Sequence, residues 1–315
     1  MKAVFLDAET LRDLDLSGLE QAFSSLTIFD KTTQKDIAPR IQNADVVIVN
    51  KVKLDATLLK ASQIKLICIV ATGTNNVDLE AAKQCGIAVF NCQAYGVPSV
   101  VQHAFALILA LHTNLIQYQQ SVEAGDWQKS DQFCLLNYPI TELAGKTLGV
   151  VGYGSLGQGV AKIAKAFGMQ VLIASRDESD CRENRLPLAQ LLPQVDVLTL
   201  HCPLTPATQN LIDEQALNIM KPSAFLVNVA RGGIVDEQAL ANALKSGVIA
   251  GAATDVLIEE PPKNGNPLLD SSVPNLIVTP HSAWGSKEAR QRIVEQTIEN
   301  VNVFLSDEQG ERRVV

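Results

Sequence analysis

The strongest constraint on the fold comes from residues 148–159, LGVVGYGSLGQG, in which a short apolar run gives way to Gly152, Gly154 and Gly157. An alanine-rich helical pattern follows at 160–167. In such a segment the first glycine allows a turn, the second allows a pyrophosphate to approach the backbone, and the third lets the helix pack close to the strand. Glycines also end strands without any function. With a strand before them and a helix after them, they predict a dinucleotide site at the N-terminus of the helix.

Short apolar runs alternate with helical patterns along most of the chain, which predicts right-handed βαβ units and parallel sheets. A length of 315 residues suggests about two domains. The α/β fold class expected here therefore consists of two doubly wound parallel-sheet domains. Expected strands lie at 2–6, 26–29, 45–49, 66–70, 88–91, 147–151, 170–174, 195–200, 224–228, 249–254 and 276–279.

The helical patterns set the expected domain boundaries. A long helix is predicted from Pro98 to Gln120, because proline is tolerated in a first turn, and an irregular surface excursion follows at 121–145. The last helix, at 286–304, is expected to return to the first sheet. This gives a discontinuous domain of 1–97 with 286–315 and a second domain of 98–285.

Composition excludes several classes of function. The formal net charge of −8 argues against binding to nucleic acid or anionic membranes, both of which require basic patches. The six cysteines show no metal-binding spacing, so no metal site is expected, and most lie beside apolar runs, as thiols in a reducing compartment do. The N-terminus resembles no signal peptide, and the apolar stretch 97–111 contains polar residues. A cytoplasmic protein with a core helix at 97–111 is expected.

Three expected strands end in residues that can do chemistry. Arg231 follows one strand, the acids of the Asp255–Glu260 segment follow another, and His281 follows the last. Ligands of open α/β sheets bind at the carboxyl ends of strands. There an arginine can clamp a carboxylate, and a carboxylate beside an imidazole would favour its charged form and fix its tautomer. The alternatives are an arginine in a surface turn and a structural histidine, which is how we interpret His103, His112 and His201.

Together with the glycine pattern, these residues indicate hydride transfer with a nicotinamide, the protein supplying a proton donor and a carboxylate clamp. The motifs GYGSLG, NVARGGIVDEQAL, DVLIEEPP and TPHSAW resemble those of the D-isomer-specific 2-hydroxyacid dehydrogenase family, along nearly the whole chain. The resemblance implies a Rossmann cofactor domain and a flavodoxin-like substrate domain, with an active-site cleft between them. It also implies Arg231, Glu260 and His281 as the catalytic arginine, acid and acid/base.

Further roles follow from the same resemblance. It implies that Asp255 receives the nicotinamide carboxamide. The substrate-binding residues it implies are Lys51, Thr72, Gly73, Thr74 and Arg231. The cofactor-binding residues it implies are Gly152, Tyr153, Gly154, Ser155, Leu156, Gly157, Ser175, Arg176, His201, Cys202, Pro203, Thr208, Val229, Ala230, Arg231, Asp255, His281 and Ala283.

One position departs from the pattern of NAD enzymes, in which an acid about 20 residues after the fingerprint accepts the ribose 2′-OH. Ser175 stands there, and Arg176 beside it offers a partner for a 2′-phosphate. We therefore expect NADP in preference to NAD. In the alternative, Asp177 takes over the acidic role.

Within the family the chain looks most like glycerate dehydrogenases and hydroxypyruvate or glyoxylate reductases, which implies a small 2-oxo acid substrate. The alternatives are another 2-hydroxy acid, such as D-lactate, and a nucleotide-sensing protein like the corepressors related to these enzymes. The family usually forms homodimers. The predicted helix 98–120 and the following excursion are the expected contact, with Trp127 either reaching a second subunit or packing within its own.

Overall fold

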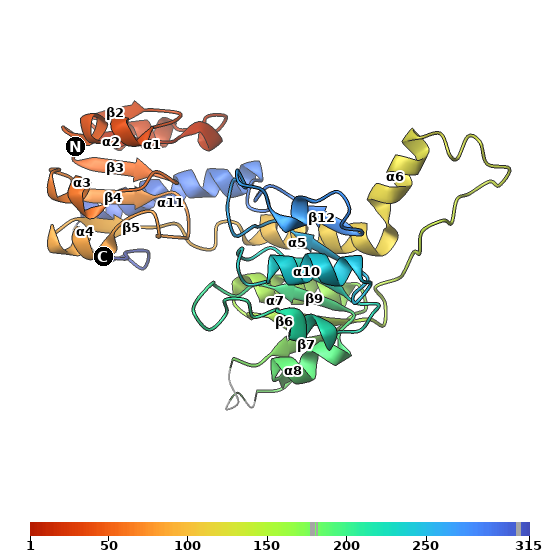
Figure 1. Cartoon of the computed structure of the whole chain (residues 1–315). Helices are drawn as coiled ribbons and strands as arrows, with labels where there is room; N and C mark the ends of the chain where they lie inside the picture. The colour runs from red at the N-terminus through yellow and green to blue at the C-terminus, as the bar shows by residue number, and fades with distance from the viewer. Residues whose placement is uncertain (177–179, 181, 307–309) are drawn as a thin grey trace. The chain divides into compact units, whose positions relative to one another are not determined.

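The protein is described by a computed structural model that covers residues 1–176, 180, 182–306 and 310–315. The chain divides into two compact units, Met1–Gly96 with Gly285–Val315, and Val97–Trp284. Each unit has its own sheet (Figure 1). Over the described residues the first sheet has five strands and the second has seven. All pairings between these strands are parallel, and an isolated antiparallel bridge joins Phe90 to Arg313. This confirms the predicted α/β class with two parallel sheets.

The sheet of the first unit has the order β2-β1-β3-β4-β5, which is the flavodoxin-like order. Its strands are β1 (Lys2–Phe5), β2 (Ser25–Ile28), β3 (Val46–Val49), β4 (Leu66–Ile69) and β5 (Ala88–Phe90). All residues of β3 and β4 are buried, as expected for parallel strands that helices cover on both faces.

The helices of this unit are α1 (Ser17–Gln21), α2 (Gln34–Ile41), α3 (Ala56–Lys60), α4 (Leu79–Gln84) and α11 (Lys287–Leu305), with a short 3-10 helix at Glu9–Leu11. Helices α2, α3 and α4 share one apolar core with the sheet, in which Val47 and Ile67 are fully buried. Helix α11, from the C-terminal part of the chain, contacts β4 and α1 and buries Ile293. A helix from the C-terminal part of the sequence thus packs against the first sheet.

The sheet of the second unit has the order β12-β11-β10-β9-β6-β7-β8, with the crossover of a dinucleotide-binding fold between β6 and β9. Its strands are β6 (Thr147–Val151), β7 (Gln170–Ala174), β8 (Arg185–Leu186), β9 (Val197–Leu200), β10 (Phe225–Asn228), β11 (Gly251–Thr254) and β12 (Leu276–Val278). Its helices are α5 (Val97–Thr113), α6 (Leu115–Glu123), α7 (Ser155–Ala166), α8 (Leu188–Leu191), α9 (Glu214–Asn218) and α10 (Glu237–Lys245), with 3-10 helices at Leu192–Gln194 and Pro267–Leu269.

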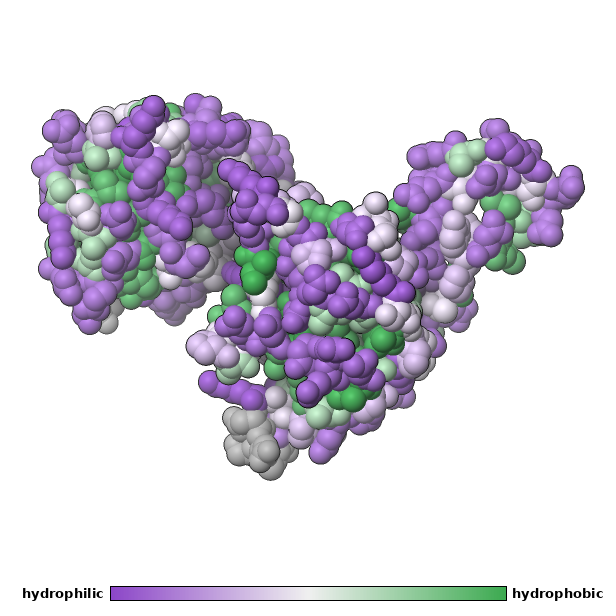
Figure 2. Space-filling view, viewed as in Figure 1, coloured by the Kyte–Doolittle hydropathy of each residue, from purple (hydrophilic) through white to green (hydrophobic). Residues whose placement is uncertain are grey.

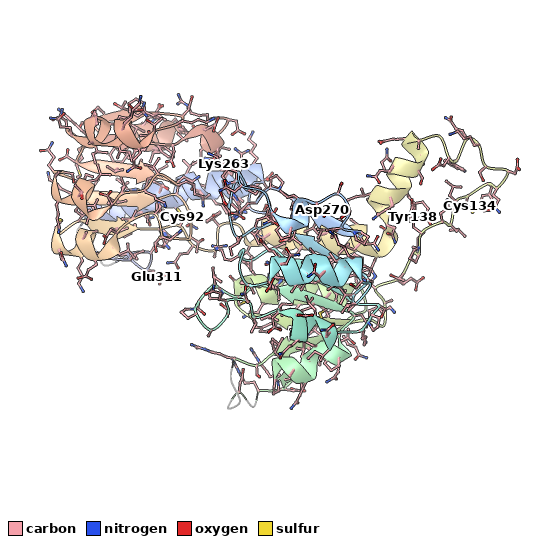
Figure 3. All side chains as sticks on the ribbon, viewed as in Figure 1. Cys92, Cys134, Tyr138, Lys263, Asp270 and Glu311 are labelled. Atoms are coloured by element: carbon pink, nitrogen blue, oxygen red, sulfur yellow. The ribbon has the colours of Figure 1, made fainter. Side chains whose placement is uncertain are left out.

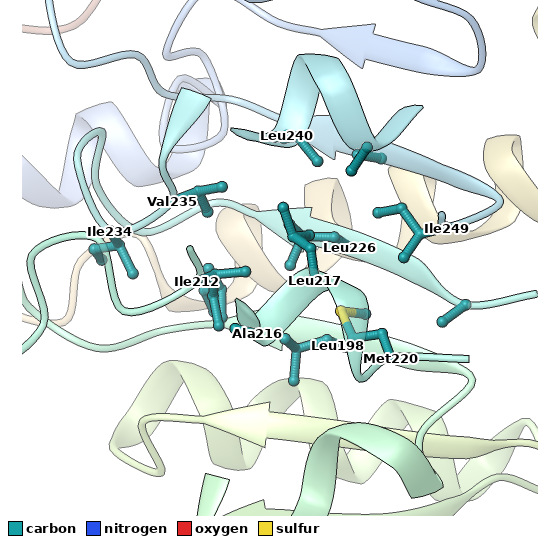
Figure 4. Close-up of a cluster of buried hydrophobic side chains, with 14 of the residues drawn as sticks. Leu198, Ile212, Ala216, Leu217, Met220, Leu226, Ile234, Val235, Leu240 and Ile249 are labelled. Carbon is teal, nitrogen blue, oxygen red and sulfur yellow. The ribbon is translucent and has the colours of Figure 1, made fainter. Parts of the chain in front are cut away.

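Two cores lie on opposite faces of this second sheet. Successive side chains of a strand point to opposite faces, so Leu198 and Leu226 enter the core that contains α9 and α10 (Figure 4). Val197 and Val227 enter the other core, with α5 and α7. The long, continuous apolar patterns of the sequence reflect this two-sided burial.

The prediction of one continuous helix over 98–120 is wrong. Asn114 adopts a left-handed conformation with φ of 49°, which separates α5 from α6 and bends the pair by 62°. Asparagine tolerates this conformation better than most residues, and the Asn114 side chain donates to the Pro139 carbonyl at 2.6 Å. The bend depends on a residue 25 positions further along the chain, so helical periodicity could not reveal it.

After this bend, residues 114–142 form an arm that extends away from the sheet of the second unit (Figure 1). Tyr138 and Cys134 lie along it (Figure 3). Hydrophobic side chains are visible on the surface of the arm (Figure 2), and Phe133 is 89% exposed and Leu136 73%. The Trp127 indole donates to the Phe133 carbonyl at 2.9 Å. The arm therefore has internal contacts but leaves much apolar surface uncovered.

The stretch 97–111, predicted to be a core helix, lies in α5 and buries Ala104 and Ile108 completely. Over the part of the chain that the structure describes, no single helix has the length and hydropathy to cross a bilayer. Helices α5 and α6 meet that criterion only as a bent pair.

The turn between β6 and α7 shows why two of its glycines differ. A Cβ atom on Gly157 would lie 2.1 Å from the Gly152 carbonyl oxygen, whereas one on Gly154 would meet no atom within 4 Å. Gly154 has a φ of −77°, which any residue adopts. Internal packing therefore explains Gly157 but not Gly154.

We predict that Gly157→Ala lowers the free energy of unfolding by about 2–3 kcal/mol, because the methyl group overpacks against the Gly152 backbone. The control, Gly154→Ala, should cost about 1 kcal/mol or less, since it changes only an N-cap residue. Urea unfolding followed by circular dichroism measures both. Equal losses in the two variants would contradict the packing role of Gly157.

Candidate active site

The three predicted catalytic residues lie after three neighbouring strands of the second unit. Arg231 follows β10, Glu260 follows β11 and His281 follows β12. The ladder pairs Asn228 with Thr254, and Thr254 with Val278, so the three carboxyl ends are level with one another. The sheet thus places the three loops at one edge.

Glu260 and His281 are in direct contact. The imidazole Nδ1 lies 2.6 Å from Glu260 Oε2, and the other carboxylate oxygen accepts the Leu257 N–H at 2.9 Å. Both side chains are about one-third exposed. Since Nδ1 faces the carboxylate, Nε2 is the ring nitrogen left to exchange a proton with a ligand.

Close backbone packing and a hydrogen-bonded turn position Arg231. A Cβ atom on the next residue, Gly232, would lie 2.0 Å from the Leu257 carbonyl oxygen, so only glycine lets the arginine loop pack this closely on the loop that carries Glu260. The buried side chain of Asn228 accepts the Ala230 N–H and donates to the Arg231 carbonyl, both at 3.0 Å. Asn228 stands in the motif NVARGG, but only the structure shows that its amide fixes the turn.

Asp255 is 1% exposed and fixes the loop that carries His281. Its carboxylate accepts the N–H groups of Ser282 and Ala283, both at 2.9 Å, and the Thr279 hydroxyl at 2.5 Å. The backbone N–H of His281 donates to the Asp255 carbonyl at 2.8 Å. The carboxylate that the sequence indicates as a cofactor contact is therefore also an internal anchor.

The predicted phosphate site lies at the start of α7, where Gly154 is the N-cap and no side chain caps the helix. The first N–H groups of a helix attract anions, and the space beside Gly154 would admit one. These features, with Tyr153, Ser155 and Leu156 beside them in the turn, fit the pyrophosphate of a dinucleotide.

The loop after β9 contains four more predicted cofactor residues: His201, Cys202, Pro203 and Thr208. The His201 N–H donates to the Val151 carbonyl at 2.7 Å, which joins this loop to the fingerprint strand. Burial lowers the pKa of His201 to about 4, so the ring is neutral, and over the described residues its buried Nδ1 has no hydrogen-bond partner. The Thr208 hydroxyl donates to the Pro203 carbonyl at 2.7 Å and so shapes the loop.

The segment after β7 holds Ser175 and Arg176, whereas Asp177 lies outside the described residues. An acid that the sequence reasoning did not single out lies nearby: Asp180 accepts two hydrogen bonds from Arg182, at 2.7 and 2.9 Å. These bonds hold the pKa of Asp180 well below its usual range. Its carboxylate also lies 3.5 Å from the Arg176 backbone nitrogen.

The predicted substrate-binding residues other than Arg231 lie in the first unit. Lys51 follows β3, and its N–H donates to the Asp7 carboxylate at 2.6 Å, as do those of Asn50 and Val52 at 2.7 and 3.0 Å. Asp7, which the sequence reasoning missed, therefore shapes the Lys51 loop. The residues Thr72, Gly73 and Thr74 follow β4, where Asn91 donates to the Thr72 carbonyl at 2.8 Å. Over the described residues no cluster of acids, histidines and cysteines could hold a metal ion.

Comparison with known proteins agrees with this arrangement. Residues 105–283 match the model of the D-isomer specific 2-hydroxyacid dehydrogenase, NAD binding domain. The chain is 46% identical over 310 residues to a glycerate dehydrogenase of Methylorubrum extorquens, covering 97% of this chain and 96% of that protein. It is 39% identical over 315 residues to a hydroxypyruvate reductase of Blautia hydrogenotrophica, covering 97% of each. An acyclic imino acid reductase solved in complex with NADPH and D-Arg superimposes with a TM-score of 0.87 at 27% identity, covering 100% of both chains. The chain is an oxidoreductase that belongs to the D-isomer-specific 2-hydroxyacid dehydrogenase family.

Proposed function

We propose that the protein reduces hydroxypyruvate or glyoxylate to D-glycerate or glycolate with a nicotinamide dinucleotide. The observation that carries this proposal is the 2.6 Å contact between His281 Nδ1 and Glu260, at the sheet edge that also carries Arg231. The similarity to a glycerate dehydrogenase and a hydroxypyruvate reductase supports the choice of substrate.

Each residue has a distinct part in this reaction. The Arg231 guanidinium forms a bidentate pair with the substrate carboxylate and polarises the keto oxygen. His281 delivers its Nε2 proton to that oxygen, while the contact with Glu260 at Nδ1 orients the ring. The backbone amides of Thr72, Gly73 and Thr74 hold the same carboxylate, and Lys51 lies in a second substrate-binding loop. The reduced nicotinamide supplies the hydride to the carbonyl carbon.

Asp255 and Ala283 would hold the nicotinamide end of the cofactor. The Asp255 Oδ2 atom accepts the Ala283 N–H, and a carboxylate oxygen has room for a second donor, which a carboxamide would supply. Val229 and Ala230, at the end of β10, would lie against the same end of the cofactor. These roles rest on the family pattern and on the position of the residues at the strand ends.

For the other end of the cofactor, we propose NADP in preference to NAD. Ser175 and Arg176 stand where an NAD enzyme carries an acid, and Arg176 can pair with a 2′-phosphate. The matched family model is described as NAD-binding, whereas the imino acid reductase holds NADPH. Both cofactors occur among similar proteins. The choice of NADP therefore rests on Ser175 and Arg176 of this chain.

We further propose a cytoplasmic homodimer joined through the arm. Reduced thiols are typical of the cytoplasm, and the cysteines of the described residues are free. Exposed apolar surface of the kind that the arm carries marks association surfaces. The competing functions are a dehydrogenase for another 2-hydroxy acid, such as D-lactate, and a nucleotide-sensing corepressor-like protein. Steady-state turnover of hydroxypyruvate, glyoxylate and pyruvate with NADPH and NADH separates these possibilities.

We predict that His281→Ala lowers kcat for hydroxypyruvate by about 10² to 10⁴, the range typical of general acid–base catalysis. Binding of NADPH, followed by nucleotide fluorescence, should persist, because the glycine turn is unchanged. A near-normal kcat at neutral pH would exclude His281 as the proton donor.

Arg176→Ala should weaken NADPH binding at least tenfold, because a charged hydrogen bond to the 2′-phosphate is lost. NADH binding should change less than about twofold. Fluorescence titration measures both dissociation constants, with Arg12→Ala in the first unit as the charge-matched control. Equal weakening for the two nucleotides would show that Arg176 does not contact the phosphate.

The double variant Phe133→Ser with Leu136→Ser should convert a dimer to a monomer, because it removes the most exposed apolar side chains of the arm. Analytical ultracentrifugation gives the mass of each species. Leu305→Ser, on helix α11 of the first unit, is the control and should stay dimeric. A monomeric wild type, or a double variant that remains dimeric, would contradict this interface.

A further inference from the structure

His103, which the sequence alone suggests is a structural histidine, contacts the hydrogen-bond network beneath the His281 loop. His103 lies on α5, and its Nε2 atom is 3.0 Å from the Thr279 hydroxyl oxygen and 3.5 Å from Asp255 Oδ1. The helix that carries it comes some 150 residues before Asp255 in the chain. Sequence spacing gives no sign of this contact.

The direction of the hydrogen bonds follows from the chemistry of the hydroxyl group. The Thr279 hydroxyl donates its single proton to Asp255 Oδ1 at 2.5 Å. It can therefore only accept from His103, so Nε2 of His103 must carry a proton. His103 donates to Thr279, and Thr279 donates to Asp255.

This chain of donors ends at the backbone that positions His281. The Asp255 carboxylate accepts the N–H groups of Ser282 and Ala283, the two residues after His281. His281 itself has a φ of 51°, in the left-handed region. A residue other than glycine stays in that region only when its surroundings over-determine it. The fixed Asp255 carboxylate supplies that constraint.

We propose that His103 is a positioning residue: through Thr279 it orients the Asp255 carboxylate, which holds the 279–283 loop and thereby aims the His281 ring. His103 does not touch the substrate. The proposal rests on the proposed function only in treating His281 as the proton donor, because the effect on the loop itself exists without substrate.

The role of His103 is tested by comparing two variants. His103→Leu removes the donor, whereas His103→Gln keeps one, because its amide nitrogen reaches about as far as Nε2. A second pair, Thr279→Val and Thr279→Ser, removes or keeps the hydroxyl without changing the helix. In the protein without added nucleotide, hydrogen exchange by mass spectrometry reports the protection of peptides that span 279–284. Steady-state kinetics with hydroxypyruvate and NADPH gives kcat and KM for the same proteins.

We expect His103→Leu and Thr279→Val to speed exchange in 279–284 and to lower kcat about tenfold, as displacement of a reacting group does. KM for hydroxypyruvate should change less than about twofold, because Arg231 lies in a different loop, the one that follows β10. His103→Gln and Thr279→Ser should restore both readouts to within about twofold of the wild type. Since His103 acts through Thr279, the double variant His103→Leu with Thr279→Val should be no worse than either single variant.

The matched control is His112→Leu, because His112 also lies on α5 and its Nδ1 contacts a threonine, Thr141, at 2.7 Å. It should lower Tm and leave kcat and the exchange of 279–284 unchanged. Normal kcat and exchange in His103→Leu, or no rescue by His103→Gln and Thr279→Ser, would overturn the proposal. If the wild type reduces no 2-oxo acid, the proposed function fails, and the exchange measurement still decides the role of His103.

Discussion

The alignment of three parallel strand ends is the constraint on which the rest of the second unit depends. The hydrogen-bonded ladder sets the ends of β10, β11 and β12 level, so residues about 50 positions apart in sequence lie at one edge. Close packing between the loops that follow these strands then sets how near they lie to each other. Gly232 lets the arginine loop approach the Leu257 backbone, and Leu257 in turn donates to Glu260. The relation between arginine and acid is set by backbone contacts, which vary less than contacts between long side chains.

Two carboxylates, Asp255 and Glu260, have different roles at this edge of the sheet. Asp255 is buried, and a buried charge is costly unless donors surround it; here two backbone N–H groups and a hydroxyl provide them. Because breaking any one of these bonds would leave the charge unsatisfied, the loop after β12 is held tightly. Glu260 is about one-third exposed and contacts the His281 ring directly. One acid thus fixes the backbone of the histidine, and the other fixes its ring.

The fingerprint turn shows a similar division between structure and ligand. At Gly157 the backbone of Gly152 occupies the position where a Cβ atom would lie, whereas the corresponding position at Gly154 is open. Past the end of the neighbouring strand β7, Asp180 is already engaged by Arg182. An acid that is paired in this way is less available to a ribose hydroxyl than an unpaired one.

Sequence alone determined the α/β class and most of the strands, because parallel strands buried on both faces leave continuous apolar runs such as those of β3 and β4. It also determined that Arg231, Glu260 and His281 follow strand ends. Tertiary structure alone decided the bend at Asn114, which depends on a hydrogen bond to Pro139, and the engagement of Asp180 by Arg182. It alone joined His103 to Asp255 through Thr279. These features arise from contacts between side chains and backbone segments that only the folded chain brings together, and local periodicity carries no information about such contacts.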